Sequence, residues 1–110
     1  MDDYKVIYSP AAKEDLFGIY SYIATQLLEP QIAKNQTDRI RNAIRSLETM
    51  PSRYGKVEWE PWMSMGMRKL PINNYIVFYL VDEPAALVKI VRIVYGGRDL
   101  RNILSNSEIE

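Results

Sequence analysis

The sequence predicts an α+β fold in which an N-terminal strand and a helical hairpin pack with a mostly antiparallel four-stranded sheet. Three observations lead to it. A short stretch rich in β-forming residues comes first, two longer stretches with helical periodicity follow, and three strand-like runs separated by short turns come last. The predicted order of elements is therefore βααβββ, followed by a short tail.

Residues 4–28 predict the first strand and the first helix. Tyr4 to Ser9 alternates and is rich in β-formers. Ser9 is a preferred helix cap, and Pro10 suits the first helical position. Apolar residues then recur at offsets of three and four, which predicts an amphipathic helix with an apolar face of Leu16, Ile19, Tyr20, Ile23, Ala24, Leu27 and Leu28.

Two prolines bound the second predicted helix. Pro30 ends the first helix and can start the next, and Pro51 ends the second. Two helices joined so closely form an antiparallel hairpin. We expect its two helices to pack through Leu16, Ile19, Ile23, Leu27, Ile40, Ile44 and Leu47. Residues 51–66 then carry prolines and glycines, together with aromatic and charged side chains, and this predicts a loop.

Three strands are predicted at about residues 67–72, 75–82 and 87–95. Asn73-Asn74 marks a tight turn between the first two, and residues 82–86 mark the second turn. Such short connections make the three strands a meander. Gly96-Gly97 breaks the last strand, and a short helical segment is predicted through Leu104.

Length and composition favour one globular domain over residues 1–110. The chain is 47% hydrophobic and 25% charged, as ordinary folded proteins are. It has no cysteine and no histidine, which excludes disulfides, thiol catalysis and a histidine base. We expect no cofactor and no metal. The acidic start Met1-Asp2-Asp3 predicts no signal peptide, and the longest apolar run, residues 75–81, is too short to span a membrane. We expect a cytoplasmic protein.

Charge is unevenly distributed along the chain although the formal net charge is zero. Residues 34–101 carry twelve basic and seven acidic residues, while both ends are net acidic. A basic middle between acidic ends could meet an anionic partner. Chance clustering on a solvated surface is an equally good interpretation, because the excess is modest for a nucleic-acid binder.

The end of the last predicted strand is the most informative stretch. The two glycines place Arg98 at a strand end, where a guanidinium could bind a phosphate or a carboxylate; the alternatives are a local pair with Asp99 and binding to a chain terminus. Lys89 and Arg92 are three residues apart, which predicts opposite sheet faces. Arg53 and Arg68 could converge with Arg98 on one sheet edge, or each could be a solvated charge.

A pair of carboxylates is the other candidate for chemistry. Glu58 and Glu60 flank Trp59 and share a face if this stretch is extended, so one of them could act as a general base. A polar loop whose tryptophans are anchored in the core or in an interface explains the same residues without any chemistry.

Taken in order, several segments resemble the RelE/ParE superfamily of bacterial toxins, which includes plasmid stabilisation proteins. The resemblance covers nearly the whole chain through residues 8–16, 19–23, 47–51, 66–68, 74–79 and 92–100. It implies a helical hairpin on a mostly antiparallel sheet. It also implies the toxin role in a type II toxin–antitoxin module: growth inhibition, neutralisation by a cognate antitoxin that wraps the toxin, and contact with promoter DNA only through that antitoxin.

The resemblance leaves two targets open. RelE-like members cleave ribosome-bound messenger RNA with an arginine after the third-strand tyrosine, an arginine at the last strand's end and a terminal tyrosine. Here Ile76 occupies the first position, Arg98 matches the second, and the third falls near Leu104. A related branch uses a loop glutamate, which Glu58 or Glu60 could match, with a terminal His-Tyr pair, but this chain has no histidine.

The Gly-Gly-Arg-Asp-Leu ending is more similar to ParE-like members, which inhibit DNA gyrase, so gyrase is the favoured target and the ribosome-dependent endoribonuclease is the alternative. As a ribonuclease, the chain would use Arg98, Arg68 and Glu58, with Lys69 as a further cation. Contact with the target is expected from Arg98, Arg92, Arg53 and Lys69.

Overall fold

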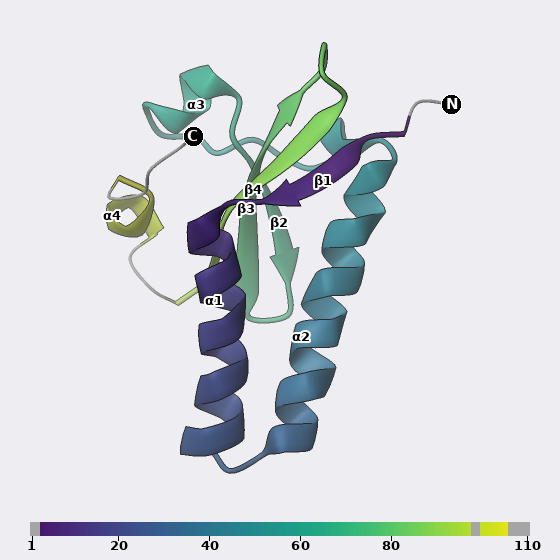
Figure 1. Ribbon diagram of the computed structural model, residues 1–110. Helices are drawn as coiled ribbons and strands as arrows, with labels where there is room; N and C mark the ends of the chain where they lie inside the picture. Colours follow the sequence, from purple (N-terminus) through teal and green to yellow (C-terminus); the bar gives the residue numbers. More distant parts are fainter. Residues whose placement is uncertain (1–2, 98–99, 106–110) are drawn as a thin grey trace.

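The computed structural model describes residues 3–97 and 100–105 of the chain, so Arg98 lies outside the described residues (Figure 1). The main elements follow the predicted order: β1 (Lys5–Tyr8), α1 (Pro10–Ser21), α2 (Pro30–Arg45), α3 (Trp62–Met65), β2 (Arg68–Ile72), β3 (Tyr75–Asp82), β4 (Leu87–Tyr95) and α4 (Leu100–Ser105). The last of these includes the helical segment predicted through Leu104.

The sheet has four strands in the order β1-β4-β3-β2. β2 pairs with β3 and β3 with β4 in antiparallel directions, whereas β1 runs parallel to β4, residues 5–8 opposite residues 87–90. The sheet is thus mostly antiparallel, which confirms the predicted α+β fold. The parallel pair joins the two ends of the chain and needs the whole intervening chain as its connection.

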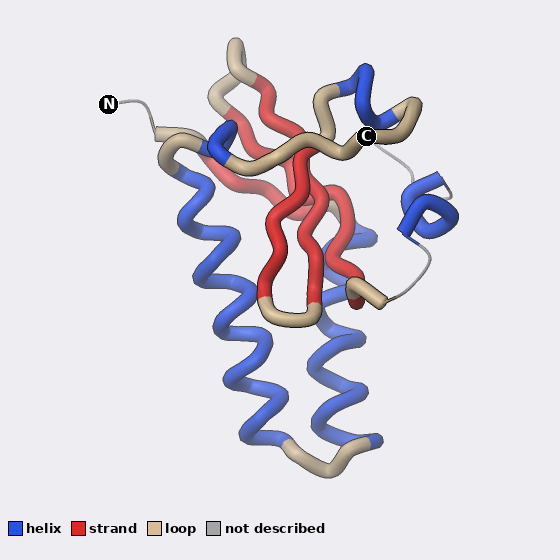
Figure 2. Tube along the Cα trace, turned by 180° about the vertical axis from the view of Figure 1, so that it is seen from behind, coloured by secondary structure: helices blue, strands red, loops and turns tan. Residues whose placement is uncertain are grey.

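Two hydrophobic clusters lie on the two faces of this sheet. On one face α1 and α2 lie side by side and extend beyond the end of the sheet, as Figures 1 and 2 show; Leu16, Ile40 and Ile44 pack there with Tyr79 and Ile90. On the other face, segment 57–67 and α4 supply Val57, Trp62, Met67 and Leu104, which pack with Phe78, Val91 and Val94.

The first helix begins as the sequence predicts but ends differently. Ser9 caps α1, its Oγ accepting a hydrogen bond from the Ala12 amide at 3.0 Å. After Ser21 the helix widens into a π-helix, Tyr22–Gln26, whose larger turn rotates later side chains away from the α-helical face. Leu27 and Leu28 are therefore 52% and 78% exposed, so the prediction that Leu27 packs between the helices is wrong.

The other predicted contacts of the hairpin hold. Leu16 and Ile23 of the first helical stretch are buried, and so are Ile40, Ile44 and Leu47 of the second. Ile19 is partly buried against the same cluster. Tyr20, also assigned to the apolar face, is 40% exposed beside α2.

Residues 51–66 are more ordered than the predicted loop. Pro51–Arg53 forms a 3₁₀ turn, and α3 forms a short helical turn. Between them the Val57 amide donates to the Met67 carbonyl at 2.8 Å, and the Lys69 amide donates to the Gly55 carbonyl at 3.0 Å. Segment 55–57 therefore pairs with the outer edge of β2. Elements of three or four residues are too short to leave a periodic pattern in the sequence.

A β-bulge in β4 changes the faces predicted for two cations. Phe78 lies opposite Arg92, Tyr79 lies opposite Ile90, and Leu80 lies opposite Lys89. Val91 therefore has no partner in β3 and is the extra residue of the bulge. Phe78 and Leu80 are two residues apart and share a face, and directly opposite residues share it with them. Lys89 and Arg92 thus lie on one face. The prediction of opposite faces is wrong because it assumed an uninterrupted strand.

Candidate functional site

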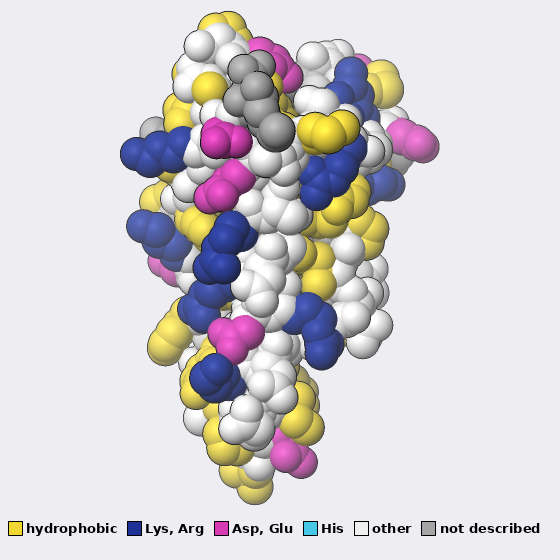
Figure 3. Space-filling model, turned by 90° about the vertical axis from the view of Figure 1, so that its right-hand side faces the viewer, with side chains coloured by type: hydrophobic (Ala, Val, Ile, Leu, Met, Phe, Trp, Pro, Cys, Tyr) yellow, Lys and Arg dark blue, Asp and Glu magenta, His cyan; other side chains and the backbone are white. Residues whose placement is uncertain are grey.

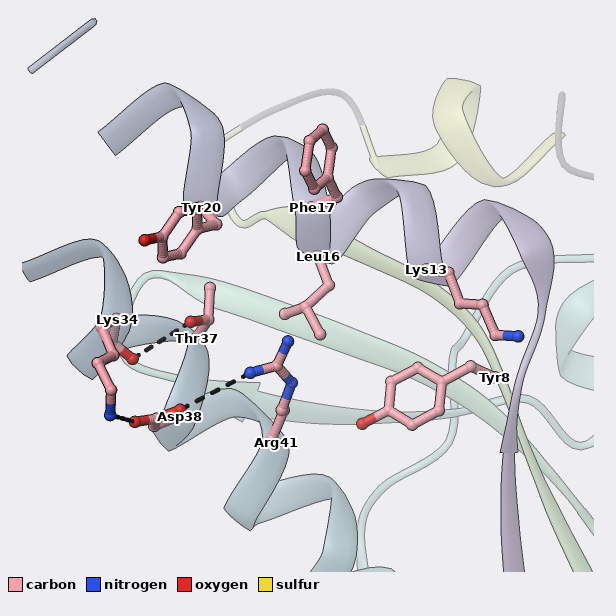
Figure 4. Close-up of a pocket in the computed structure, with 9 residues that line it drawn as sticks. All are labelled: Tyr8, Lys13, Leu16, Phe17, Tyr20, Lys34, Thr37, Asp38 and Arg41. Atoms are coloured by element: carbon pink, nitrogen blue, oxygen red, sulfur yellow. Dashed lines mark hydrogen bonds and ion pairs between the residues drawn. The ribbon is translucent and has the colours of Figure 1, made fainter. Parts of the chain in front are cut away.

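A groove of about 750 Å³ lies between α1 and α2, as Figure 4 shows. Both helices contribute residues one turn apart, which is why the side chains align along the groove. Tyr8 at the end of β1 lies at one end. The groove is lined by Tyr8, Lys13, Leu16, Phe17, Tyr20, Lys34, Thr37, Asp38 and Arg41.

The groove combines exposed aromatic rings with cations. Phe17 is 72% exposed. Lys34 Nζ lies 2.8 Å from Asp38 Oδ2, and Arg41 Nη1 lies 3.7 Å from Asp38 Oδ1. The hydrogen bond between Lys34 and Asp38 raises the pKa of Lys34 and lowers the pKa of Asp38. Together with Lys13, which also lines the groove, these residues give three cations to one carboxylate, so the groove is net positive at neutral pH.

The positive charge of the groove affects the pKa of Tyr8 at its end. Burial raises the pKa of its phenol, while the nearby guanidinium groups of Arg41 and Arg45 lower it. Figure 3 faces α2 and shows lysine and arginine side chains running along the molecule, with hydrophobic side chains exposed toward the hairpin end. Such a surface suits an amphipathic partner with acidic side chains.

Asp15 is a structural residue that the sequence did not point to. β1 ends opposite Ile90, and beyond it α1 covers the outer edge of β4. There the Ser9 hydroxyl donates to the Val91 carbonyl at 2.8 Å, and Asp15 Oδ2 accepts from the Ile93 amide at 2.9 Å. The same carboxylate receives Arg92, with Nε at 2.7 Å and Nη2 at 2.9 Å. This hydrogen bonding raises the pKa of Arg92.

Arg53 and Arg68, for which convergence with Arg98 was one of two possibilities, both contact Tyr54, while Arg98 lies outside the described residues. Arg53 lies over the Tyr54 ring, 4.8 Å from its centroid, and donates to the Thr49 carbonyl at 2.6 Å. Arg68 Nη1 donates to the Tyr54 carbonyl at 2.6 Å. Both guanidinium groups also lie near Tyr79, whose pKa burial raises to about 12. The two arginines hold the backbone that follows α2.

The remaining predicted residues are divided between surfaces. Lys69 lies opposite Phe78, which in turn lies opposite Arg92, so Lys69, Arg92 and Lys89 share the face away from the helical hairpin. Arg68 lies opposite Tyr79 on the hairpin face. A site using both Arg68 and Lys69 would have to wrap around the edge of β2.

The two candidate carboxylates are also separated in role. Glu58 is exposed. Glu60 accepts hydrogen bonds from the Ser64 amide at 3.1 Å and from the Ser64 hydroxyl at 2.7 Å, which stabilises the turn of α3. In the described part of the chain no group of three or more acidic residues gathers as metal ligands do, and no helix there has the length and apolarity needed to cross a membrane.

A helical hairpin on a mostly antiparallel sheet is the fold that the resemblance to RelE/ParE-superfamily toxins implied. Residues 6–100 match the sequence profile described as "ParE toxin of type II toxin-antitoxin system, parDE". This match spans most of the chain, and the chain belongs to that family. No curated protein sequence matches the chain significantly.

The solved structures with a similar fold include two from toxin–antitoxin systems. One is a chain of the chromosomal ParDE system from P. aeruginosa, with a TM-score of 0.70 and 20% identity, covering 84% of this chain and 95% of that one. The other is a chain of the RelBE2 toxin–antitoxin complex from Mycobacterium tuberculosis, with a TM-score of 0.59 and 23% identity, covering 86% and 93%. At this identity the likeness concerns the fold.

Proposed function

We propose that this type II toxin acts in the cytoplasm, that it inhibits DNA gyrase without a cofactor, and that a cognate antitoxin neutralises it. The family match over residues 6–100 carries the proposal. The toxin would inhibit through a complementary surface, because inhibition of a protein target needs no catalytic group.

The residues present favour a protein target over RNA cleavage. Ile76 and Leu104 stand where RelE-like ribonucleases are expected to carry an arginine and a tyrosine, and the chain has no histidine. Arg68 is bonded to a backbone carbonyl, and Arg92 is bonded to Asp15. Both guanidinium groups thus already have structural partners within the fold.

Ribosome-dependent cleavage of messenger RNA is the second candidate. Its support is the row of Lys69 and Arg92 beside Phe78, which puts two cations on one sheet face. Glu58 would act as the base, and Arg68 and Arg98 would stabilise the charge on the phosphate, so the site would have to extend from this face around the edge of β2 to Arg68. Loss of one such stabilising group typically lowers a rate about 10²–10³-fold.

Two assays run side by side with purified toxin distinguish these candidates. We expect inhibition of supercoiling by the gyrase holoenzyme and intact messenger RNA on programmed ribosomes. Arg98→Ala is tested in both assays. Cleavage of ribosome-bound messenger RNA that disappears in Arg98→Ala, with supercoiling unaffected, would establish the second candidate instead. If expression of this protein alone does not arrest growth, it is an inactive protein with the toxin fold, and both candidate functions are contradicted.

The groove between α1 and α2 is the proposed contact for the antitoxin. Its exposed aromatic rings and its excess of cations fit the apolar and acidic sides of an amphipathic segment. The ParDE and RelBE2 structures are themselves toxin–antitoxin systems, which supports a partner of this kind. Any contact with promoter DNA would be made by the antitoxin.

Co-expression tests this contact. The product of the neighbouring small gene should restore growth to cells that express the toxin. Arg41→Glu, inside the groove, should remain toxic and escape neutralisation, because it would repel an acidic partner. Arg39→Glu makes the same charge change on α2 at an exposed position that does not line the groove. Equal neutralisation of both variants would place the antitoxin elsewhere.

A further inference from the structure

A second hollow lies at the opposite end of the sheet from the loop joining β3 and β4. It has a volume of about 290 Å³ and is built by the β2–β3 turn and the end of β4: Pro71, Asn73, Asn74, Tyr75, Ile76, Tyr95, Gly96 and Gly97. None of these lining residues is charged. The Gly96 amide donates to the Asn74 carbonyl at 2.8 Å, which fixes the end of β4 to the turn.

Tyrosines form the wall of this hollow. Tyr75 and Tyr95 are cross-strand partners whose rings meet edge to face, with centroids 5.9 Å apart. Tyr95 is 50% exposed although it ends a central strand, and Tyr22 is 57% exposed. Burial raises the pKa of Tyr75, and the nearby Tyr95 and Tyr22 raise it further, so Tyr22 lies in the neighbourhood of the Tyr75–Tyr95 pair.

Two unusual backbone features hold the exposed rings in place. A Cβ on Gly97 would lie 2.7 Å from Cε2 of Tyr95, so the ring rests where only glycine leaves room. Tyr22 is the first residue of the π-helix that follows α1, a rare element that frequently occurs at functional sites. Gly97 and the start of the π-helix both accompany an exposed tyrosine, so neither tyrosine ring contributes to the core.

We propose that Tyr22, Tyr75 and Tyr95 form the anchor through which this toxin grips its protein target, with an apolar or aromatic side chain of gyrase entering the hollow. This assignment rests on the proposed function. Rigid, exposed tyrosines are typical of the few residues that dominate protein–protein affinity. A nucleic acid would need cations for its phosphates, and none of the described residues that line the hollow is charged.

The size and position of the hollow agree with this partner. Its volume is at the lower limit of the roughly 300–1,000 Å³ of small-molecule sites, so one inserted side chain suits it better than a free ligand. None of its lining residues lines the groove between α1 and α2. A variant in the hollow should therefore leave antitoxin binding intact.

The two adjacent glycines provide a matched experiment. Gly97→Ala puts a methyl group into the Tyr95 ring, whereas on Gly96 the nearest atom to a Cβ is the Asn74 carbonyl oxygen at 3.4 Å, which is close to ordinary contact. Neither glycine has a left-handed backbone. We expect Gly97→Ala and Tyr95→Ala to weaken binding of purified gyrase by about thirty-fold or more, and Gly96→Ala to bind nearly as wild type does.

Three readouts separate the possible outcomes. Binding of gyrase is measured by biolayer interferometry, folding by thermal melting, and antitoxin binding by co-purification with the product of the neighbouring gene. Tyr22→Ala, on an exposed side chain, repeats the test where folding is not at risk. A folded Tyr95→Ala or Tyr22→Ala that binds gyrase and arrests growth as wild type does overturns the inference.

Two further outcomes also count against it. Loss of antitoxin binding together with gyrase binding would assign the tyrosines to the antitoxin. Failure of the wild-type toxin to bind gyrase would instead refute the proposed function, and tyrosine variants that then lose binding to programmed ribosomes would assign the tyrosines to RNA stacking.

Discussion

Asp15→Ala is the substitution whose consequence follows most directly from the structure. The carboxylate accepts the Ile93 amide at the edge of β4 and two guanidinium nitrogens of Arg92. A buried donor left without an acceptor costs about 1–3 kcal/mol, and a broken buried ion pair costs about 3–5 kcal/mol. The side chains of Arg92 and Asp15 are 22% and 15% exposed, so the second figure must be discounted.

We therefore expect Asp15→Ala to lower the free energy of unfolding by roughly 2–4 kcal/mol, a large share of the roughly 5–15 kcal/mol of a typical domain. Asp15→Asn keeps an acceptor for the Ile93 amide and should lose less. Urea unfolding followed by circular dichroism gives both values, and a double-mutant cycle with Arg92→Met isolates the pair.

Asp38→Ala is the control for this experiment, because Asp38 also pairs with cations but is exposed, and exposed pairs contribute little. A loss below about 0.5 kcal/mol in Asp15→Ala, or a coupling energy near zero with Arg92→Met, would refute the reasoning. The guanidinium of Arg92 could then leave Asp15 and contact the target, as we expect from the sequence.

Three other predictions concern stability. Arg53→Ala should lower the free energy of unfolding by about 1 kcal/mol, because the Thr49 and Met50 carbonyls lose a donor; unchanged stability with lost toxicity would make Arg53 a target contact. Ile23→Ala should cost about 2–5 kcal/mol in thermal or urea unfolding, whereas Leu27→Ala should change little because that side chain is exposed; equal losses would contradict the packing described. The pKa of Tyr79 is about 12 in the folded state and about 10 in the unfolded state, so the stability that its neutral phenol contributes is complete below pH 10 and is lost by pH 12. Between these pH values the free energy of unfolding of the wild type should fall by up to about 3 kcal/mol more than that of Tyr79→Phe. Plots of this free energy against pH that run parallel for the two proteins would disprove the shift.

The elements that repeat a pattern were predictable from the sequence. Alternation and helical spacing located β1, α2 and the three-strand meander, because each buries one face over several turns or residues. Leu27 was misplaced because nothing in the spacing from Leu16 to Ile23 signals the widening of the helix at Tyr22. A one-residue change of helical pitch is set by the tertiary contacts around it.

The candidate site was less predictable because it depends on contacts between distant segments. The bulge at Val91 put Lys89 and Arg92 on one face, and no residue type at that position requires a bulge. Asp15 looked like an ordinary surface carboxylate until α1 was seen to cover the edge of β4. The groove between α1 and α2 likewise required the two helices to be placed next to each other.

The parallel pair of β1 and β4 has a consequence for synthesis. Residues 5–8 cannot find their partner until residues 87–90 have left the ribosome. At about 5–20 residues per second, translation of the intervening chain takes roughly 4–16 seconds, during which the helical hairpin can form but its sheet remains incomplete. A nascent chain therefore cannot complete its sheet before β4 has emerged, several seconds after β1, which puts a delay between synthesis of the helical hairpin and formation of the finished fold.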